Sequence, residues 1–448
     1  MLSPGDETLV RRDPLTGLAL LLDDDALAER LGAPVSRGYL RHKRGVSCTL
    51  ALDVGGRPAF ALAYRPGAPK LAKTVAAARP DDLLLVDDAA GVVVARPPAD
   101  RDLPALARLA RDPARLLARV GVRGIGVRGV GVRGVGDPAD PAEPAADPAA
   151  SGLRTLAHKP QRRWVGLLTP ASGEAVVLRV HRPADTLATL GGTRALQGAG
   201  LRVPQILGAD ATRGVVALTW VPGTGLHRLL AAGTATADDL RATGAALAAL
   251  HALPAGALPV RSAPDEVTDL RRAAEAVSSL DPTLAGRAHA LAERLAVALS
   301  DRRTSPVTVH GDFSADQVVI DADGTVGLVD LDAVGGGEAE GDLGSAIAAL
   351  HSGAVRGADR LGPWAAADVT GPASALLAGH EAAGCAATVD EDRLRVHTAA
   401  ALLRRAVDPF RRCSPRWPDE VARLLTTAED AELAGWAGRS RMPVGGAR

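Results

Sequence analysis

A glycine-rich repeat after the first 120 residues constrains the architecture most. Residues 121–136 read GVRGIGVRGVGVRGVG, and residues 137–150 continue with recurring Pro, Ala and Asp. Glycine at every second or third position, followed by repeated proline, cannot hold a helix or bury a core. We therefore predict a flexible linker over residues 121–150, after a first segment of residues 1–120. The three arginines of the repeat leave open a second interpretation, a basic tether for an anionic partner.

Two similar segments flank this linker. Residues 40–43 (LRHK) and 156–159 (LAHK) each open a set of short apolar runs, which end in residues 60–66 (FALAYRP) and 177–183 (VLRVHRP). Short apolar runs separated by turn residues predict antiparallel strands. We therefore predict two small sheets of similar build, the first forming an N-terminal repeat of the second. The first sheet is either a lobe that lost its site or one that packs on the second. The predicted hairpin tips are Gly55–Gly56 and Ser172–Gly173.

Beyond residue 183 the spacing of apolar residues becomes helical. Thr236 followed by Asp239 predicts a helix start with a capping box, and Leu240, Leu247 and Leu250 follow at helical spacing. We expect a β-containing segment over residues 151–222 and a mainly helical one over residues 223–448. A second amphipathic helix is predicted from Leu394, Leu402, Leu403 and Ala406, with a stop at Asp408–Pro409.

Composition excludes several classes of function. The 52 basic residues are balanced by 52 acidic ones, whereas a nucleic-acid-binding protein normally carries a basic excess, so no nucleic-acid partner is expected. No apolar run is long enough to span a membrane, and the N-terminus lacks the pattern of a secretion signal. The three cysteines, Cys48, Cys385 and Cys413, are odd in number and far apart, which favours reduced packing residues and a cytoplasmic location. Composition does not indicate an oligomeric state.

The most informative stretch is residues 307–343, VTVHGDFSADQVVIDADGTVGLVDLDAVGGGEAEGDL. A polar loop over residues 310–317 precedes a predicted hairpin, with strands at 318–320 and 326–331 and a turn at Asp323–Gly324. Because a hairpin places its two ends side by side, the loop should lie next to the end of the return strand.

This hairpin end gathers oxygen-bearing side chains. Asp312 and Gln317 lie in the loop, and Asp330 follows the return strand. Two carboxylates and one amide form a hard-oxygen site, which suits a magnesium ion that also binds substrate phosphates.

The order of these residues resembles the catalytic segment of protein-kinase-like enzymes, most closely the aminoglycoside phosphotransferase and choline kinase group. The resemblance covers about residues 153–410. It implies an α+β, protein-kinase-like fold of two lobes, a small antiparallel β lobe and a mainly helical one. Five pieces occur in the family's order: His310, Asp312 and Gln317; residues 329–332 (VDLD); residues 341–343 (GDL); residues 218–223 (LTWVPG), as the link between lobes; and residues 247–251 (LAALH).

The resemblance implies a role for each of these residues. Asp312 would orient and deprotonate the acceptor hydroxyl, while Gln317 and Asp330 would hold Mg²⁺ between the phosphates of ATP or GTP. His310 would brace the loop and Asp342 would anchor it from a helix start, whereas Asp316 and Asp332 would only be solvated or capping residues. Nucleotide contacts are expected from Arg179, Lys159, Leu218 and Trp220.

Several positions depart from the family pattern. Position 317 is Gln where Asn is usual, and the strand cation is Arg179 where Lys is usual. The helix around residues 190–197 contains no Glu to pair with that cation. Lys159, Arg162 and Arg163 are alternative phosphate contacts, or simply an exposed basic strand end.

The sequence therefore predicts a kinase that phosphorylates a small-molecule hydroxyl, in an aminoglycoside, a sugar or an amino alcohol. The alternative is a pseudokinase that binds a nucleotide or a partner without transfer. A protein substrate is disfavoured, because neither a glycine-rich Gly-x-Gly-x-x-Gly loop nor an Ala-Pro-Glu segment is found. Glu338, Glu340 and Asp342 could favour a cationic acceptor, or could only solvate a loop around Gly335–Gly337.

Overall fold

The chain divides into two compact units. The first comprises Met1–Gln197, Pro204–Val221 and Asp408–Pro418, and the second comprises the remaining segments, of which Pro222–Val407 is the largest. The division between Val221 and Pro222 falls inside the segment that we expected to link two lobes. The structure, a computed structural model, describes residues 1–122, 152–170, 174–300, 306–355, 360–361, 364–365, 369–384 and 389–433.

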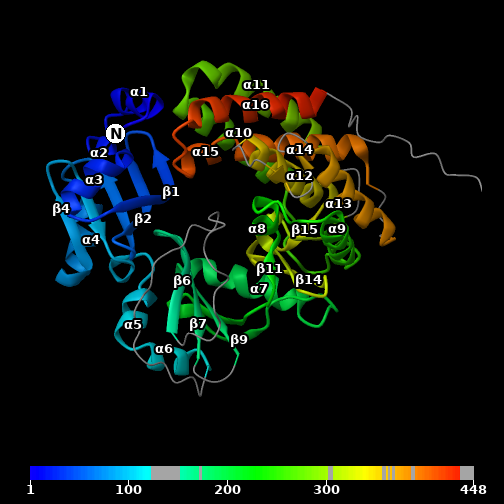
Figure 1. The fold of residues 1–448 in the computed structure, drawn as a ribbon, viewed down its shortest axis with the longest axis horizontal. Helices are drawn as coiled ribbons and strands as arrows, with labels where there is room; N and C mark the ends of the chain where they lie inside the picture. Colours follow the sequence, from blue (N-terminus) through cyan, green and yellow to red (C-terminus); the bar gives the residue numbers. More distant parts are fainter. Residues whose placement is uncertain are drawn as a thin grey trace, which may run out of the picture. The chain divides into compact units, whose positions relative to one another are not determined.

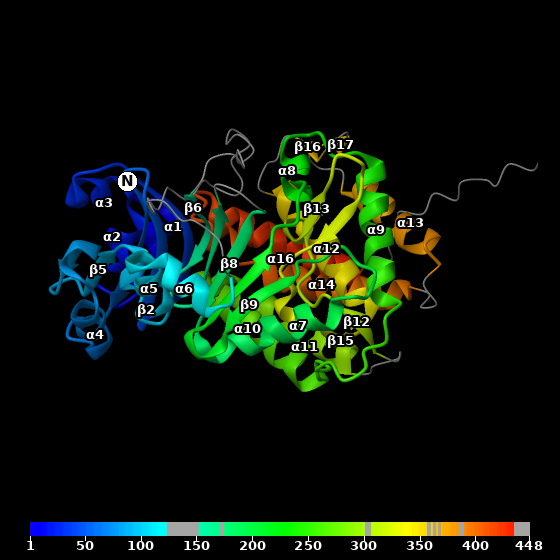
Figure 2. The same ribbon diagram turned by 90° about the horizontal axis from the view of Figure 1, so that it is seen from below.

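The N-terminal part of the first unit is a five-stranded antiparallel sheet with short helices (Figures 1 and 2). Its spatial order is β1-β2-β3-β5-β4, so the last two strands are exchanged relative to chain order. Every residue of β3 and β5 is buried, as expected for central strands of a covered sheet. The strands are β1 (Val35–Lys43), β2 (Ser47–Val54), β3 (Pro58–Tyr64), β4 (Leu83–Asp87) and β5 (Val92–Ala95), and the helices are α1 (Pro4–Arg12), α2 (Leu18–Leu22), α3 (Asp24–Leu31) and α4 (Pro69–Ala77).

A second five-stranded antiparallel sheet follows, with the equivalent order β6-β7-β8-β10-β9. In both sheets the first strand pair contains a register shift, between Arg37 and Leu40 in one and between Thr155 and Ala157 in the other. The α+β class and the additional N-terminal β-containing region are thus confirmed. The elements are α5 (Ala105–Arg111), α6 (Pro113–Arg119), β6 (Gly152–Lys159), β7 (Arg163–Thr169), β8 (Val176–His181), α7 (Thr186–Leu196), β9 (Ile206–Asp210) and β10 (Val215–Thr219).

The same close backbone approach occurs in both sheets. The Tyr64 N–H donates to the Gly91 carbonyl at 3.0 Å, and the His181 N–H donates to the Gly214 carbonyl at 2.7 Å. Both glycines have positive φ, and a Cβ at either would lie 2.2 or 2.1 Å from the facing carbonyl oxygen. Only glycine fits these positions, so an identical constraint acts on the two sheets.

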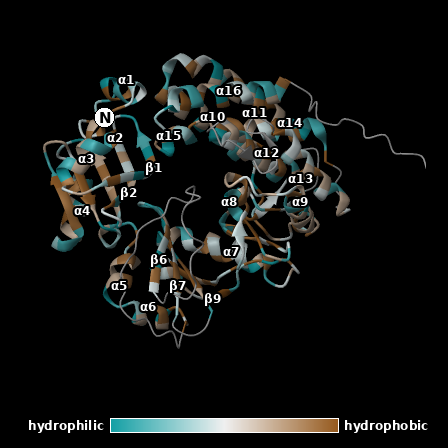
Figure 3. Ribbon diagram, viewed as in Figure 1, coloured by the Kyte–Doolittle hydropathy of each residue, from teal (hydrophilic) through white to brown (hydrophobic). Residues whose placement is uncertain are grey.

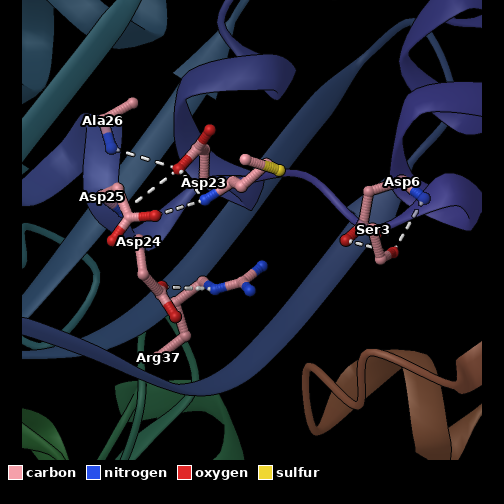
Figure 4. Close-up of polar contacts among 8 residues, drawn as sticks. Ser3, Asp6, Asp23, Asp24, Asp25, Ala26 and Arg37 are labelled. Carbon is pink, nitrogen blue, oxygen red and sulfur yellow. Dashed lines mark hydrogen bonds and ion pairs between the residues drawn. The ribbon is translucent and has the colours of Figure 1, made fainter.

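Polar caps define the starts of the first helices (Figure 4). Ser3 accepts a hydrogen bond from the Asp6 N–H at the start of α1. The Asp23 carboxylate accepts from the N–H groups of Asp25 and Ala26 at the start of α3. Because the first N–H groups of a helix have no partner within it, such caps stabilise each helix by about 1 kcal/mol.

Two of the cysteines are packing residues, as predicted. Cys48 is fully buried on β2, and burial raises the pKa of its thiol. Burial also raises the pKa of Cys413 to about 12. Cys385 lies outside the described residues.

We expect both described thiols to resist alkylation in the folded protein. Iodoacetamide should modify Cys48 and Cys413 roughly tenfold or more slowly in the native protein than in urea, because the thiolate is the reactive form. Peptide mass spectrometry after timed quenching measures this. Equal rates in both states would contradict the burial seen here.

The second unit is mainly helical. Its helices show alternating hydrophilic and hydrophobic stretches (Figure 3), as expected for amphipathic helices around a core. The capping box of Thr236 and Asp239 at the start of α9 is confirmed. The predicted later helix is α14, which ends at Arg405, and Asp408–Pro409 then begin the short helix α15 (Asp408–Arg411) of the first unit. The helices are α8 (Leu226–Ala231), α9 (Ala237–His251), α10 (Ala263–Leu280), α11 (Ala285–Ser300), α12 (Ala339–Val355), α13 (Thr370–Ala382), α14 (Glu391–Arg405) and α16 (Trp417–Leu433).

A glycine triplet forms a strand rather than the loop that we considered. Gly335–Gly337 is β15, which pairs antiparallel with β12 (Val307–Val309). A Cβ at Gly335 would lie 2.6 Å from the Pro259 carbonyl oxygen, so a larger residue does not fit against the backbone of that segment. The other strands of this unit are β11 (Thr224–Gly225), β13 (Val318–Ile320), β14 (Val326–Leu328), β16 (Arg360–Leu361) and β17 (Trp364–Ala365).

Two expectations fall wholly or largely outside the described residues. These are the linker of residues 121–150, apart from its first two residues, and the hairpin tip at Ser172–Gly173. Within the described part of the chain, no helix combines the length and apolar character needed to cross a bilayer.

Candidate functional site

The predicted hairpin of residues 318–331 is present but shorter. Strands β13 and β14 pair from Val318 opposite Leu328 to Ile320 opposite Val326. Gly324 has φ of 82° in the turn, a conformation that favours glycine. The return strand ends at Leu328 because Asp330 adopts a left-handed conformation with φ 62° and ψ 54°.

One residue, Val329, connects the loop to the end of the hairpin. The His310 ring donates through Nε2 to the Val329 carbonyl at 3.0 Å. The Val329 N–H donates to the Gln317 carbonyl at 2.9 Å. Both ends of the loop that carries Asp312 are therefore fixed to the residue before Asp330. The structure thus brings Asp312, Gln317 and Asp330 to the same end of the hairpin, as the sequence predicted.

Asp342 anchors this loop from the first turn of α12. Its carboxylate accepts hydrogen bonds from the N–H groups of His310 at 2.6 Å and Gly311 at 2.9 Å, and lies 3.2 Å from His251 Nε2. Burial alone would raise the pKa of Asp342, but His251 and the backbone donor outweigh it and lower the pKa. Gly311 has φ of 82°, and a Cβ there would lie 2.3 Å from the Ala333 carbonyl oxygen. The predicted anchoring role of Asp342 and the bracing role of His310 are confirmed.

The histidine pair behind Asp342 makes the fold sensitive to acid. His380 Nε2 lies 3.0 Å from His251 Nδ1, and burial together with His251 lowers the pKa of His380 from 6.5 to about 4. A histidine with a lowered pKa in the folded state takes up its proton more readily when unfolded. We expect the free energy of unfolding to fall as pH drops from about 6.5 to about 4. In urea unfolding at a series of pH values, His380→Asn should flatten this fall, and an unchanged slope would contradict the assignment.

Asp312 lies in a negatively charged environment. Its side chain reaches solvent, but the surrounding protein removes enough hydration to raise its pKa, and the charges of Asp316 and Asp330 raise it further. The positive charge of Arg405 acts in the opposite direction and lowers the pKa of Asp312. Within the part of the chain that the structure describes, no group of three or more His, Cys, Asp and Glu side chains is arranged so that it could hold a metal ion.

Gln317 is held inside the loop by its own neighbours. Its side chain is 6% exposed, and its amide oxygen accepts from the Ser314 hydroxyl at 2.5 Å. Its amide nitrogen donates to Asp316 at 3.2 Å. The Ser314 hydroxyl also contacts Asp316 and can donate to only one acceptor at a time.

Asp316, which the sequence suggested is only a solvated or capping residue, lies beside the predicted metal ligand Gln317. Burial would raise its pKa, but the Ser314 hydroxyl and the charge of Arg405 lower it, so Asp316 is kept ionised. The short 3₁₀ turn Ala315–Gln317 brings Asp316 beside Gln317. The sequence signal for this placement is that Asp316 directly precedes Gln317, the predicted metal ligand.

The predicted nucleotide contacts lie in the first unit, where two of them are part of the sheet core. Arg179 lies on β8 opposite Val165 and Val216 and is 5% exposed. Leu218 is buried in a cluster with Leu190 and Val216.

The other two predicted nucleotide contacts have contrasting surroundings. Trp220 is 38% exposed, just beyond β10. Lys159, at the end of β6, places its Nζ 5.5 Å from the centre of the Tyr39 ring. This cation–π contact of Lys159 joins the second sheet to the N-terminal one.

The acidic residues that follow Asp330 at positions 338, 340 and 342 are buried. The Glu338 carboxylate binds Arg393 and lies 2.8 Å from His397 Nε2. Burial would raise the pKa of Glu338, but His397 and Arg393 together lower it to about 2. Glu340 accepts from the Asp390 N–H at 3.0 Å. With Glu338 7%, Glu340 3% and Asp342 2% exposed, these carboxylates bind within the protein and do not solvate a surface loop.

Comparison with known families identifies this region. Residues 161–376 match the profile of the family described as the phosphotransferase enzyme family. These residues form a phosphotransferase-family domain. The match covers the chain from β7 to α13, including the whole loop and hairpin around Asp312.

Several solved structures are similar to the chain at low identity. They include a macrolide 2′-phosphotransferase from Brachybacterium faecium (17% identity, 70% of this chain and 97% of that chain, TM-score 0.43). Another is an aminoglycoside phosphotransferase from Streptomyces rimosus (18% identity, 58% and 95%, TM-score 0.43). A third is a candidate fructosamine-3-kinase from Thermobifida fusca (17% identity, 72% and 99%, TM-score 0.47). No curated protein sequence matches the chain significantly.

Proposed function

We propose that this protein is a small-molecule kinase that transfers the γ-phosphoryl group of ATP or GTP to a hydroxyl of an aminoglycoside, a sugar or an amino alcohol. One observation carries the proposal: Asp312, Gln317 and Asp330 meet at one end of a hairpin inside a phosphotransferase-family domain. Phosphoryl transfer needs positioning and charge neutralisation more than covalent catalysis. The Asp312 loop, whose two ends are held by hydrogen bonds, supports both positioning and charge neutralisation.

In this proposal the chain's own residues position the acceptor. The Asp312 carboxylate accepts the hydroxyl proton as the acceptor oxygen bonds to the γ-phosphorus, and the bond from that phosphorus to the leaving diphosphate breaks. Asp330 and Gln317 would hold Mg²⁺, which would neutralise phosphate charge when bound. Asp342 and His310 keep the Asp312 loop in place. The nucleotide contacts proposed in the first unit are Arg179, Lys159, Leu218 and Trp220.

A second candidate function is a pseudokinase that binds nucleotide without transfer. Two observations favour it: helix α7 contains no Glu, and Lys159 lies against Tyr39. Both concern nucleotide binding, whereas the carboxylates Asp312 and Asp330 are retained.

The two functions are separated by measuring Mg²⁺-dependent ADP and GDP release against a panel of aminoglycosides, sugars and amino alcohols. The kinase proposal expects release that depends on at least one acceptor and stops with EDTA. Nucleotide binding measured by calorimetry, without release for any acceptor, would favour the pseudokinase.

A further inference from the structure

The turn between β6 and β7 contains a residue in an unfavourable backbone conformation. Gln161 has φ of 63°, in the left-handed region that favours glycine. The equivalent residue in the turn between β1 and β2 is Gly45, which also has φ of 63° and likewise lies two positions after a His-Lys pair. The second sheet therefore has a glutamine where the first has glycine, and surrounding contacts must hold it in this conformation.

An aspartate holds the backbone of each of these turns. In the first sheet the Asp13 carboxylate accepts a hydrogen bond from the Gly45 N–H at 3.1 Å. In the second sheet the Asp100 carboxylate accepts from the Gln161 N–H at 2.7 Å, and Asp100 is 2% exposed. Because the backbone contact is the same for glycine and for glutamine, it gives no reason for the glutamine side chain.

The side chain of Gln161 joins the turn to the N-terminal sheet. Its amide nitrogen donates to the Tyr64 hydroxyl, on β3, at 3.0 Å. Its amide oxygen accepts from Arg41 Nη2, on β1, at 3.2 Å and from the Thr49 hydroxyl, on β2, at 3.4 Å. A glycine at position 161 would keep the backbone contact with Asp100 and lose every one of these side-chain contacts.

The N-terminal sheet has an apolar residue in place of the cation proposed to contact the nucleotide. Tyr64 and His181 occupy equivalent positions, since each donates its N–H to a glycine carbonyl in the same way. Leu62 precedes Tyr64 by two residues, as Arg179 precedes His181, and Leu62 is 1% exposed. A buried leucine cannot bind phosphate, which favours a supporting role for the first sheet.

We propose that Gln161 is a positioning residue through which the N-terminal sheet holds the β6–β7 turn for nucleotide binding. The turn lies between Lys159, one of the proposed nucleotide contacts, and Arg163, which pairs with it across the hairpin. A turn that is fixed in advance loses less conformational entropy when the nucleotide binds, so the affinity is higher. The inference rests on the proposed kinase function and gives the N-terminal sheet a role in it.

The test removes the contact from each of its two sides. Gln161→Gly suits the left-handed backbone and keeps the N–H that donates to Asp100, while Tyr64→Phe removes only the hydroxyl that accepts from Gln161. We expect each variant to raise the Kd of ADP with Mg²⁺, measured by calorimetry, roughly three- to tenfold. Because both changes break the same contact, the double variant should bind about as well as Gln161→Gly alone.

Kinetics and a matched control separate positioning from a general loss of stability. With an acceptor that is phosphorylated, the nucleotide KM should rise by the same factor, while kcat and the acceptor KM stay within about twofold. The control is Arg30→Gln, which removes a surface ion pair with Asp87 in the same part of the chain and leaves the turn untouched. Its Kd should equal the native value. Circular dichroism and urea unfolding establish that every variant is folded at the assay temperature.

Each outcome decides the inference. A native Kd in either variant, additive losses in the double variant, or an equal loss in Arg30→Gln overturns the role of Gln161 and leaves the kinase proposal intact. The expected weakening without phosphorylation of any acceptor supports the role of Gln161 and counts against the kinase. If the native protein binds no nucleotide, both proposals fall.

Discussion

Asp312→Asn should lower kcat by roughly two to four orders of magnitude. The amide keeps the shape of the side chain and cannot accept the hydroxyl proton. Because Asp342, His310 and Val329 hold the loop through contacts that do not involve the Asp312 side chain, the fold should be unchanged. Steady-state kinetics with the acceptor identified from the panel measures the loss, and the nucleotide KM should change little.

The matched control for this prediction is Asp323→Asn. Asp323 lies in the exposed turn of the same hairpin, where its carboxylate accepts from the Thr325 N–H at 2.9 Å. An amide oxygen can accept the same bond, so activity should stay within about twofold of the native value. A kcat for Asp312→Asn within threefold of the native value would remove Asp312 from the role of base.

Glu338→Ala should lower the free energy of unfolding by about 3–5 kcal/mol. The variant leaves the Arg393 guanidinium buried without its carboxylate, since Arg393 is 4% and His397 5% exposed. Urea unfolding at pH 7 measures the loss as a lower midpoint with an unchanged slope. Most of this loss comes from the buried charge of Arg393, which no longer has a carboxylate to compensate it.

The control pair for this prediction is exposed. Arg271 binds Glu293 at 2.7 Å on the surface of α10 and α11, and Glu293→Ala should cost less than about 1 kcal/mol. The double variant Glu338→Leu with Arg393→Met should recover much of the lost stability, because it removes both charges. A midpoint for Glu338→Ala equal to that of Glu293→Ala would contradict the assigned role of the buried pair.

Local patterns predicted the hairpin and the helix starts well, because short-range chemistry determines them. The turn at Asp323–Gly324 and the capping box of Thr236 and Asp239 depend on residues within a few positions of one another. The grouping of Asp312, Gln317 and Asp330 followed from the hairpin itself. The roles of these three residues, and of the nucleotide contacts in the first unit, remain predictions.

Long-range contacts could not be predicted in the same way. The strand at Gly335–Gly337 pairs with Val307–Val309, and a Cβ at Gly335 would lie 2.6 Å from the carbonyl oxygen of Pro259, more than 70 positions away. Glu338 looks like a solvated residue in the sequence, and only the fold brings Arg393 and His397 to it.

The central claim is that a phosphoryl group moves from the nucleotide to an acceptor hydroxyl. The most direct measurement is ³¹P NMR of the purified protein with Mg²⁺, ATP and each acceptor, followed over time. The account predicts a new phosphomonoester signal on one acceptor, formed in equal amount to ADP and absent with Asp312→Asn. ADP accompanied only by inorganic phosphate, or no change in a protein shown to bind ATP, would contradict it.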